Sequence, residues 1–171
     1  MLRIDLRALE RGPVETAGAL APDDPLFEGL DFTLGEPVRV RGEIAAAGPD
    51  QYFWRGELAT RVHGECRRCL ALVDADVTAA IGVLFTEDAQ ADDPAAWVIE
   101  PHAVELDLRP TIREELILSV PAYLLCREDC RGLCPGCGQD LNLGSCTCPP
   151  SRDPRWGALG ALRDRLPEDA R

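Results

Sequence analysis

The sequence predicts an α+β protein dominated by an antiparallel β-sheet, with one main helix and a cysteine-rich C-terminal tail. Two long segments, residues 51–63 and 71–85, alternate apolar and polar side chains with the period of two that is typical of half-buried strands. Residues 110–119 form the one convincing helical segment, and eight cysteines fall in four close pairs. A curled, barrel-like sheet is one form that such a set of strands could take.

Shorter alternating segments add strands on both sides of this long pair. The segments that we expect as strands are, in order, 2–7, 37–46, 51–63, 71–85, 97–99 and 104–108. Residues 11–31 contain several prolines and glycines and predict a loop, from which a few apolar side chains enter the core, namely Leu26, Phe27 and Leu30. The first cysteine pair falls in the turn between the two long strands.

Local signals mark both ends of the helix and divide the chain. Pro110 suits a first helical turn, and Pro121 stops the helix. We expect an antiparallel β-rich domain over residues 1–121, a cysteine-rich metal-binding segment over 122–148 and a C-terminal tail over 149–171. In this tail an apolar stripe predicts a short amphipathic helix that contains Trp156, Leu159, Leu162 and Leu166.

The spacing of the cysteines indicates two zinc sites. Tetrahedral zinc bound by thiolates takes four ligands, so four short-spaced pairs fill two all-cysteine sites with none left over. A short pair suits this role because one tight turn directs both sulfur atoms to one point. Gly138 follows such a pair and can adopt positive φ there. The proposed ligands are Cys66, Cys69, Cys126, Cys130, Cys134, Cys137, Cys146 and Cys148.

Two groupings of the cysteine pairs are open. In the preferred one, the pair that begins at Cys66 joins the pair that begins at Cys126, and the pairs that begin at Cys134 and Cys146 form a local site. The local site is favoured because a short loop closes at low entropic cost. In the alternative, the Cys126 and Cys134 pairs form one site, and the Cys66 pair joins the Cys146 pair.

Other uses of the cysteines fit the sequence less well. A disulfide framework is typical of secreted proteins, and residues 1–7 lack the apolar core of a signal peptide. A redox-active CxxC normally begins a helix after a strand, whereas Cys66 and Cys69 lead into another strand. No apolar run reaches the roughly 18 residues that a membrane span needs, so we expect a cytoplasmic protein with no membrane contact.

The charge balance limits the partners. The formal net charge is -12, and eight thiolates with two Zn²⁺ ions would add −8 and +4, which gives −16. Such a charge repels nucleic-acid phosphates and attracts basic proteins, so direct RNA contact is disfavoured. The local exception is a set of arginines beside the proposed ligands, which could offset the thiolate charge or contact RNA: Arg67, Arg68, Arg127 and Arg131.

The sequence contains no visible catalytic arrangement. The chain has no lysine, which excludes a lysine-based phosphate loop and a Schiff base. Glu114 and Glu115 are adjacent and would point about 100° apart on a helix, so they are not an acid–base pair. His63 precedes the first cysteine pair and is a weak alternative ligand, and His102 follows a proline in an expected loop. We therefore expect no enzymatic activity.

Several motifs resemble those of the YceD family. They are the CxxC between strands, the segment from Glu105 through Leu108 that leads into Arg113–Pro121, the cysteine-rich stretch with Gly132–Gly138 and Asp140–Asn142, and Asp153–Trp156. The resemblance is strongest over 58–84 and 105–158. It implies a role in accumulation of the large-subunit ribosomal RNA, in bacteria and plant organelles, with no established catalytic activity. It would also place Asp107 and Glu114 on a recognition surface.

The sequence therefore predicts a non-enzymatic ribosome-biogenesis factor. We expect it to bind a basic ribosomal protein or a pre-ribosomal rRNA–protein particle. A redox-sensitive zinc-thiolate chaperone is the alternative, in which the cysteine thiolates act as an oxidation sensor masked by zinc.

Overall fold

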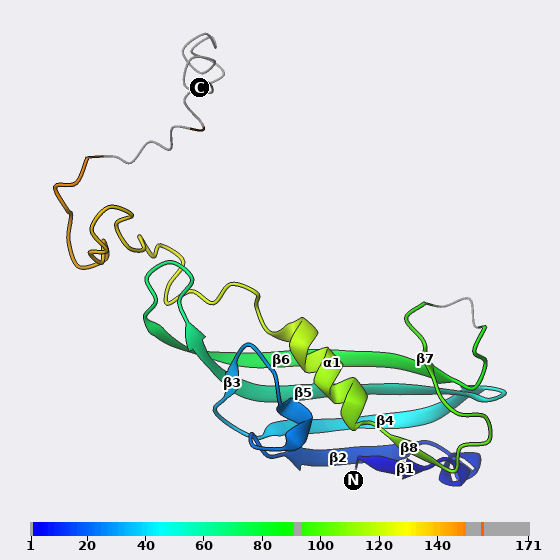
Figure 1. The fold of residues 1–171 in the computed structure, drawn as a ribbon. Coiled ribbons are helices and arrows are strands. Elements are labelled where there is room, and N and C mark those ends of the chain that lie inside the picture. Colours follow the sequence, from blue (N-terminus) through cyan, green and yellow to red (C-terminus); the bar gives the residue numbers. More distant parts are fainter. Residues whose placement is uncertain (1, 91–93, 150–154, 156–171) are drawn as a thin grey trace.

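The structure is a computed structural model that describes residues 2–90, 94–149 and 155 (Figure 1). A six-stranded sheet contains β2 (Val14–Leu20), β4 (Val38–Gly48), β5 (Gln51–Glu65), β6 (Leu72–Thr86) and β7 (Trp97–Val98) in that spatial order, and β3 (Thr33–Leu34) lies beside β5. A separate two-stranded sheet pairs β1 (Arg3–Asp5) with β8 (Glu105–Asp107). The prediction of a sheet-dominated fold with one main helix is confirmed.

The β5–β6 hairpin forms the centre of the fold. Its antiparallel register is continuous from Gln51 opposite Thr86 to Glu65 opposite Leu72. Both strands have 15 residues, so the hairpin reaches well beyond the helix at one end (Figure 1). The turn at this end carries the first cysteine pair, as the alternating pattern predicted.

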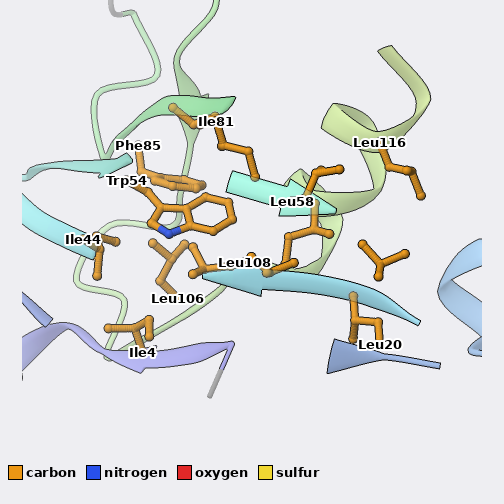
Figure 2. Packing of buried hydrophobic residues seen from close by; sticks show 14 of the residues in the cluster. Ile4, Leu20, Ile44, Trp54, Leu58, Ile81, Phe85, Leu106, Leu108 and Leu116 are labelled. Atoms are coloured by element: carbon orange, nitrogen blue, oxygen red, sulfur yellow. The ribbon is translucent and has the colours of Figure 1, made fainter. Parts of the chain in front are cut away.

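One face of the sheet forms the core. The buried apolar side chains of the three long strands are Val38, Val40, Ile44, Trp54, Leu58, Val62, Val77, Ile81, Val83 and Phe85. The β1–β8 pair, helix α1 (Arg109–Ser119) and the residue between β8 and α1 contribute to the same cluster, with Ile4, Leu106, Leu108, Ile112 and Leu116. Trp54 and Phe85 lie near its centre (Figure 2), and the indole Nε1 of Trp54 donates a hydrogen bond to Thr16 Oγ1 on β2 at 3.0 Å.

Helix α1 crosses the core face of the sheet and brings the chain back toward the β5–β6 turn (Figure 1). Ile112 and Leu116 are fully buried beneath it. Arg113 donates from its guanidinium to the carbonyl oxygens of Leu26 and Glu28, at 2.9 and 3.1 Å. The helix is thereby fixed to the segment that contains the short 3₁₀ helix Pro25–Phe27, and the cysteine-rich segment leaves from its C-terminal end.

Three expectations need correction. The N-terminal strand covers only Arg3–Asp5, because Asp5 caps a 3₁₀ helix over Leu6–Arg11 by accepting from the Arg7 N–H. Residues 11–31 are not a continuous loop, since β2 runs along β4 from Val14 to Leu20. The sheet does not close into a barrel, because β2 and β7 each pair with one neighbour among the strands that the structure describes.

The amphipathic helix expected around Trp156–Leu166 lies outside the described residues. In the part of the chain that the structure describes, no helix combines the length and the apolar character that crossing a membrane requires.

Candidate metal centres

The first cysteine pair lies in a tight turn at the end of the β5–β6 hairpin. The Cys66 N–H donates to the carbonyl of Ala71, and the Leu70 N–H donates to the carbonyl of Cys66, both at 2.8 Å. Leu70 adopts a positive φ of 61°, a conformation that glycine tolerates better than leucine. The turn therefore directs both thiols out of one short segment and strains Leu70 to do so.

The Cys134 pair repeats this turn in the tail. The Cys134 N–H donates to the carbonyl of Gln139, and the Gly138 N–H donates to the carbonyl of Cys134, again at 2.8 Å each. Gly138, at the position equivalent to Leu70, has a φ of 74°. Two turns of one kind, far apart in the sequence, thus present one CxxC pair each.

The structure brings the Cys66 pair and the Cys126 pair together. All four sulfur atoms lie within 4.8 Å of one another. The Sγ atoms of Cys66 and Cys130 are 3.8 Å apart, and those of Cys69 and Cys126 are 3.6 Å apart. Zn–S bonds of about 2.3 Å in a tetrahedron require sulfur separations of about 3.8 Å, whereas a disulfide requires about 2.0 Å. The spacing fits a tetrahedral metal centre.

Backbone contacts hold the tail against the hairpin turn around this tetrad. The Arg67 N–H donates to the carbonyl of Leu124 at 2.9 Å, and the Leu133 N–H donates to the carbonyl of Arg68 at 3.1 Å. The Arg68 guanidinium bonds the carbonyls of Glu128 and Cys130, each at 2.9 Å. In this tetrad Cys66, Cys69 and Cys130 are buried, while Cys126 is exposed.

The second tetrad is local to the tail. The sulfur atoms of the Cys134 and Cys146 pairs also lie within 4.8 Å of one another. The Cys146 thiol donates to Cys134 Sγ at 3.2 Å, and the Gly136 N–H donates to the same sulfur at 3.4 Å. Cys137 is exposed, and Cys146 and Cys148 are half-buried. The eight cysteines are therefore gathered in the preferred grouping of the sequence analysis.

Hydrogen bonds divide the thiols of each tetrad into more and less acidic members. The backbone N–H of Cys126 lowers the pKa of Cys66 to about 6, and the thiol of Cys146 lowers the pKa of Cys134 to about 6. The side-chain hydrogen bonds to Cys130 and Cys137 raise the pKa values of Cys126 and Cys148, respectively, to about 12. In each tetrad one cysteine is thus a thiolate near neutral pH, which is the form that binds metal.

The other candidate residues lie apart from the sulfur atoms or serve the fold. His63 Nδ1 lies 2.6 Å from Asp74 Oδ1 on the neighbouring strand, and the residue belongs to neither tetrad. Asp107 accepts from the N–H and the guanidinium of Arg109 at the start of α1, and the guanidinium bonds lower its pKa. Glu114 is exposed on the helix, and His102 lies in the segment before β8.

The four arginines named in the sequence analysis are all exposed, and each is adjacent in sequence to a cysteine of the first tetrad. Two of them have defined contacts. Arg68 donates to carbonyl oxygens of the tail, and Arg127 Nε lies 3.3 Å from Asp129 Oδ1. Arg67 lies in the hairpin turn and Arg131 follows Cys130 in the tail, and both are exposed.

A groove of about 740 Å³ adjoins the first tetrad. Its walls include Leu70 and Ile117, which are 59% and 44% exposed, and Leu124 from the segment after α1. Residues 29–33, which lead into β3 and include its first residue, also line the groove. This groove could not be predicted from the sequence, because it forms only when the helix end, the hairpin turn and a loop come together.

Asn142, which belongs to the Asp140–Asn142 motif of the sequence analysis, has a contact that sequence reasoning did not predict. Its side-chain amide contacts Cys130 of the first tetrad, although the residue lies between the cysteine pairs of the second. The signal for its structural role is the preceding Asp140, whose Oδ1 accepts from the Asn142 N–H at 2.8 Å. Nothing in the sequence gives the contact with Cys130.

Comparison with known proteins finds one family and several relatives. Residues 54–163 match the family described as large ribosomal RNA subunit accumulation protein YceD. A protein of Mycobacterium tuberculosis with no assigned function is 34% identical over 92% of this chain and 89% of its own length. A Zea mays protein, named large ribosomal RNA subunit accumulation protein YCED homolog 1, chloroplastic, is 40% identical over 83% of this chain and 54% of its own. No solved structure matches.

Proposed function

Because the chain belongs to the YceD family, whose described role is the accumulation of large-subunit ribosomal RNA, we propose that it is a non-enzymatic ribosome-biogenesis factor that holds a basic ribosomal protein or an rRNA–protein intermediate. The match to this family supports the ribosomal part of the proposal. The formal charge of -12 supports a basic protein as the direct contact, because exposed phosphates are repelled by such a chain. The proposed location is the cytoplasm.

We propose that both cysteine tetrads bind Zn²⁺. The supporting observation is the sulfur spacing of 3.6 and 3.8 Å in the first tetrad, close to that of a tetrahedral thiolate centre. The proposed ligands of this site are Cys66, Cys69, Cys126 and Cys130, and those of the second site are Cys134, Cys137, Cys146 and Cys148. The role of the metal is structural: it fixes the 122–148 segment to the β-rich domain over 1–121.

The groove beside the first tetrad is our candidate for the contact with the partner. Its exposed apolar walls, Leu70 and Ile117, can bury apolar side chains of the partner, while the acidic surface of the chain attracts the partner's basic residues.

The test is co-sedimentation with large-subunit precursor particles, followed by crosslinking to identify the neighbour. Ile117→Ser should reduce co-sedimentation, whereas Leu118→Ser, an exposed neighbour that does not line the groove, should not. Equal binding by both variants would place the contact elsewhere.

Direct RNA recognition requires a separate test. Arg67→Glu with Arg131→Glu reverses charge beside the first tetrad and leaves Arg68, which bonds tail carbonyls, in place. We expect weak binding of naked rRNA by the parent protein and no loss of particle binding in the variant. Tight binding of naked rRNA that the variant abolishes would favour an RNA contact instead.

The exposed sulfur atoms of Cys126 and Cys137 favour a second candidate, a redox-sensitive zinc-thiolate chaperone, because bound zinc would hold both as thiolates that oxidants can reach. Such a protein would release zinc at modest peroxide concentration and then suppress aggregation of an unfolded client. The ribosome-biogenesis proposal expects particle binding to require the zinc-loaded protein. Gain of client binding on oxidation, without any co-sedimentation in the loaded state, would favour the chaperone.

A further inference from the structure

Asn142 connects the two tetrads. In the chain it belongs to the second site, since it lies in the 138–145 loop between Cys137 and Cys146. In space it touches the first site, because its Nδ2 donates to Cys130 Sγ at 3.4 Å. The Asn142 amide therefore lies in the loop of the second site and contacts a sulfur atom of the first.

The orientation of the Asn142 amide is fixed by its neighbours. Its Oδ1 accepts from the Arg131 N–H and from the Arg127 guanidinium, both at 2.8 Å. Both partners can only donate, so the reversed amide would place its NH₂ group against two donors. The NH₂ group is thus directed at the Cys130 sulfur.

The loop that carries Asn142 also has a defined shape. Asp140 Oδ1 accepts from the backbone N–H and from Nδ2 of Asn142, at 2.8 and 2.7 Å. The Leu141 N–H donates to the carbonyl of Gly132 at 2.9 Å, which ties the loop to the strand-like segment before Cys134. The two ends of the loop are Cys137 and Cys146, so a metal ion bound by the second tetrad would close it.

We propose that Asn142 is a positioning residue that links metal binding at the two tetrads. Metal at the second tetrad closes the 138–145 loop and places the Asn142 amide against Cys130. The hydrogen bond stabilises negative charge on this sulfur and so raises the metal affinity of the first tetrad. By thermodynamic linkage, metal at the first tetrad raises the affinity of the second by the same factor. The inference rests on the proposed metal sites.

The test is titration of the metal-free full chain with Co²⁺, whose thiolate charge-transfer absorption reports each tetrathiolate site. Cys146→Ser removes the second site and should lower the Co²⁺ affinity of the first by about 10-fold, within the range for lost outer hydrogen bonds. Asn142→Ala should lower the Co²⁺ affinity of the first site by a similar factor, while the second site still binds Co²⁺. Because one hydrogen bond carries both effects, the double variant should lose no more than either single variant. Leu143→Ala, in the same loop with its side chain 88% exposed, is the matched control and should change nothing.

Four outcomes would count against the proposal or its premise. A first-site affinity that stays within about twofold in Cys146→Ser, or a double variant in which the two losses multiply, overturns the linkage. Binding of fewer than two Co²⁺ by the parent chain overturns the proposed sites themselves. The reciprocal variant Cys69→Ser leaves the Asn142 loop untouched and should weaken the second site by the same factor. An unchanged second site there would contradict the proposal even if Asn142→Ala failed to fold.

Discussion

Two glycines of the tail adopt nearly the same backbone conformation in different surroundings. Gly132 has a φ of 72° and lies against the hairpin turn, where an added Cβ would come within 2.9 Å of the Arg68 carbonyl oxygen. Gly138 has a φ of 74°, and an added Cβ would meet nothing within 4 Å. At position 132 both the positive φ and the close approach of the Arg68 backbone require glycine. At position 138 only the positive φ favours it.

Alanine substitution at these two glycines should therefore have unequal effects. Gly138→Ala should cost about 1 kcal/mol through left-handed strain, whereas Gly132→Ala should cost about 1–3 kcal/mol more, because backbone must move to relieve the contact. Chemical denaturation of the zinc-loaded variants measures the difference. Equal destabilisation by the two substitutions would show that the tail does not pack on the turn at Arg68.

The acidic thiols predict how zinc binding depends on pH. With pKa values of about 6, Cys66 and Cys134 are already thiolates at neutral pH, so they have no proton for zinc to displace. Binding at about pH 7.5 should release fewer than four protons per zinc ion. As the pH falls through about 6, both thiolates gain protons, and the zinc affinity should fall more steeply. Calorimetry in buffers of different ionisation enthalpy counts the protons, and release of four per zinc at pH 7.5 would contradict these pKa values.

At the scale of elements, a buried hydrogen bond joins the centre of the sheet to its edge. Trp54 on β5 and Thr16 on β2 are both buried, and their hydrogen bond spans the intervening β4. Thr16→Val would leave the indole N–H buried without a partner, so we expect a cost of about 1–3 kcal/mol in the free energy of unfolding.

Two matched variants refine this prediction. Thr78→Val, at an exposed position of β6, should change stability by less than about 0.5 kcal/mol. The double variant Trp54→Phe with Thr16→Val should lose less than the sum of the single losses, because each single variant leaves one polar group unpaired. Strict additivity in thermal or denaturant unfolding would show that the hydrogen bond does not contribute.

The sequence predicts elements well where bulky side chains alternate and poorly where small ones do. The long hairpin was predicted from its valines, isoleucines and aromatic residues. Strand β2 was missed because its inward positions include Thr16 and Gly18, which carry little apolar signal. Gly18 is small because Leu2 packs there, with Leu2 Cγ 2.8 Å from where a Cβ would lie.

The grouping of the cysteines was predictable from the sequence, and the surroundings of the two tetrads only partly. Cysteine spacing identified the pairs, and loop length favoured the grouping that the structure adopts. The positive φ of Leu70 could not be read from the sequence, because leucine gives no signal for that conformation. The Asn142 contact was equally hidden, since it depends on how the tail folds back on Cys130.

At the scale of the whole molecule, net charge should control the partner contact. The chain carries -12 formally, and exposed charges are screened over about 8 Å at physiological ionic strength. Binding of a basic ribosomal protein should therefore weaken about tenfold or more between roughly 0.05 M and 0.5 M salt. Fluorescence anisotropy with the labelled partner measures this, and an affinity independent of salt would point to a contact made by the apolar groove alone.

The metal content of purified, zinc-saturated protein tests the central claim most directly. Native mass spectrometry should find two Zn²⁺ ions in the parent chain, one in Cys130→Ser and one in Cys146→Ser, because each substitution removes one tetrad. Fewer than about 1.5 zinc ions per parent chain, or loss of both ions from Cys146→Ser at saturating zinc, would contradict two separate tetrathiolate sites.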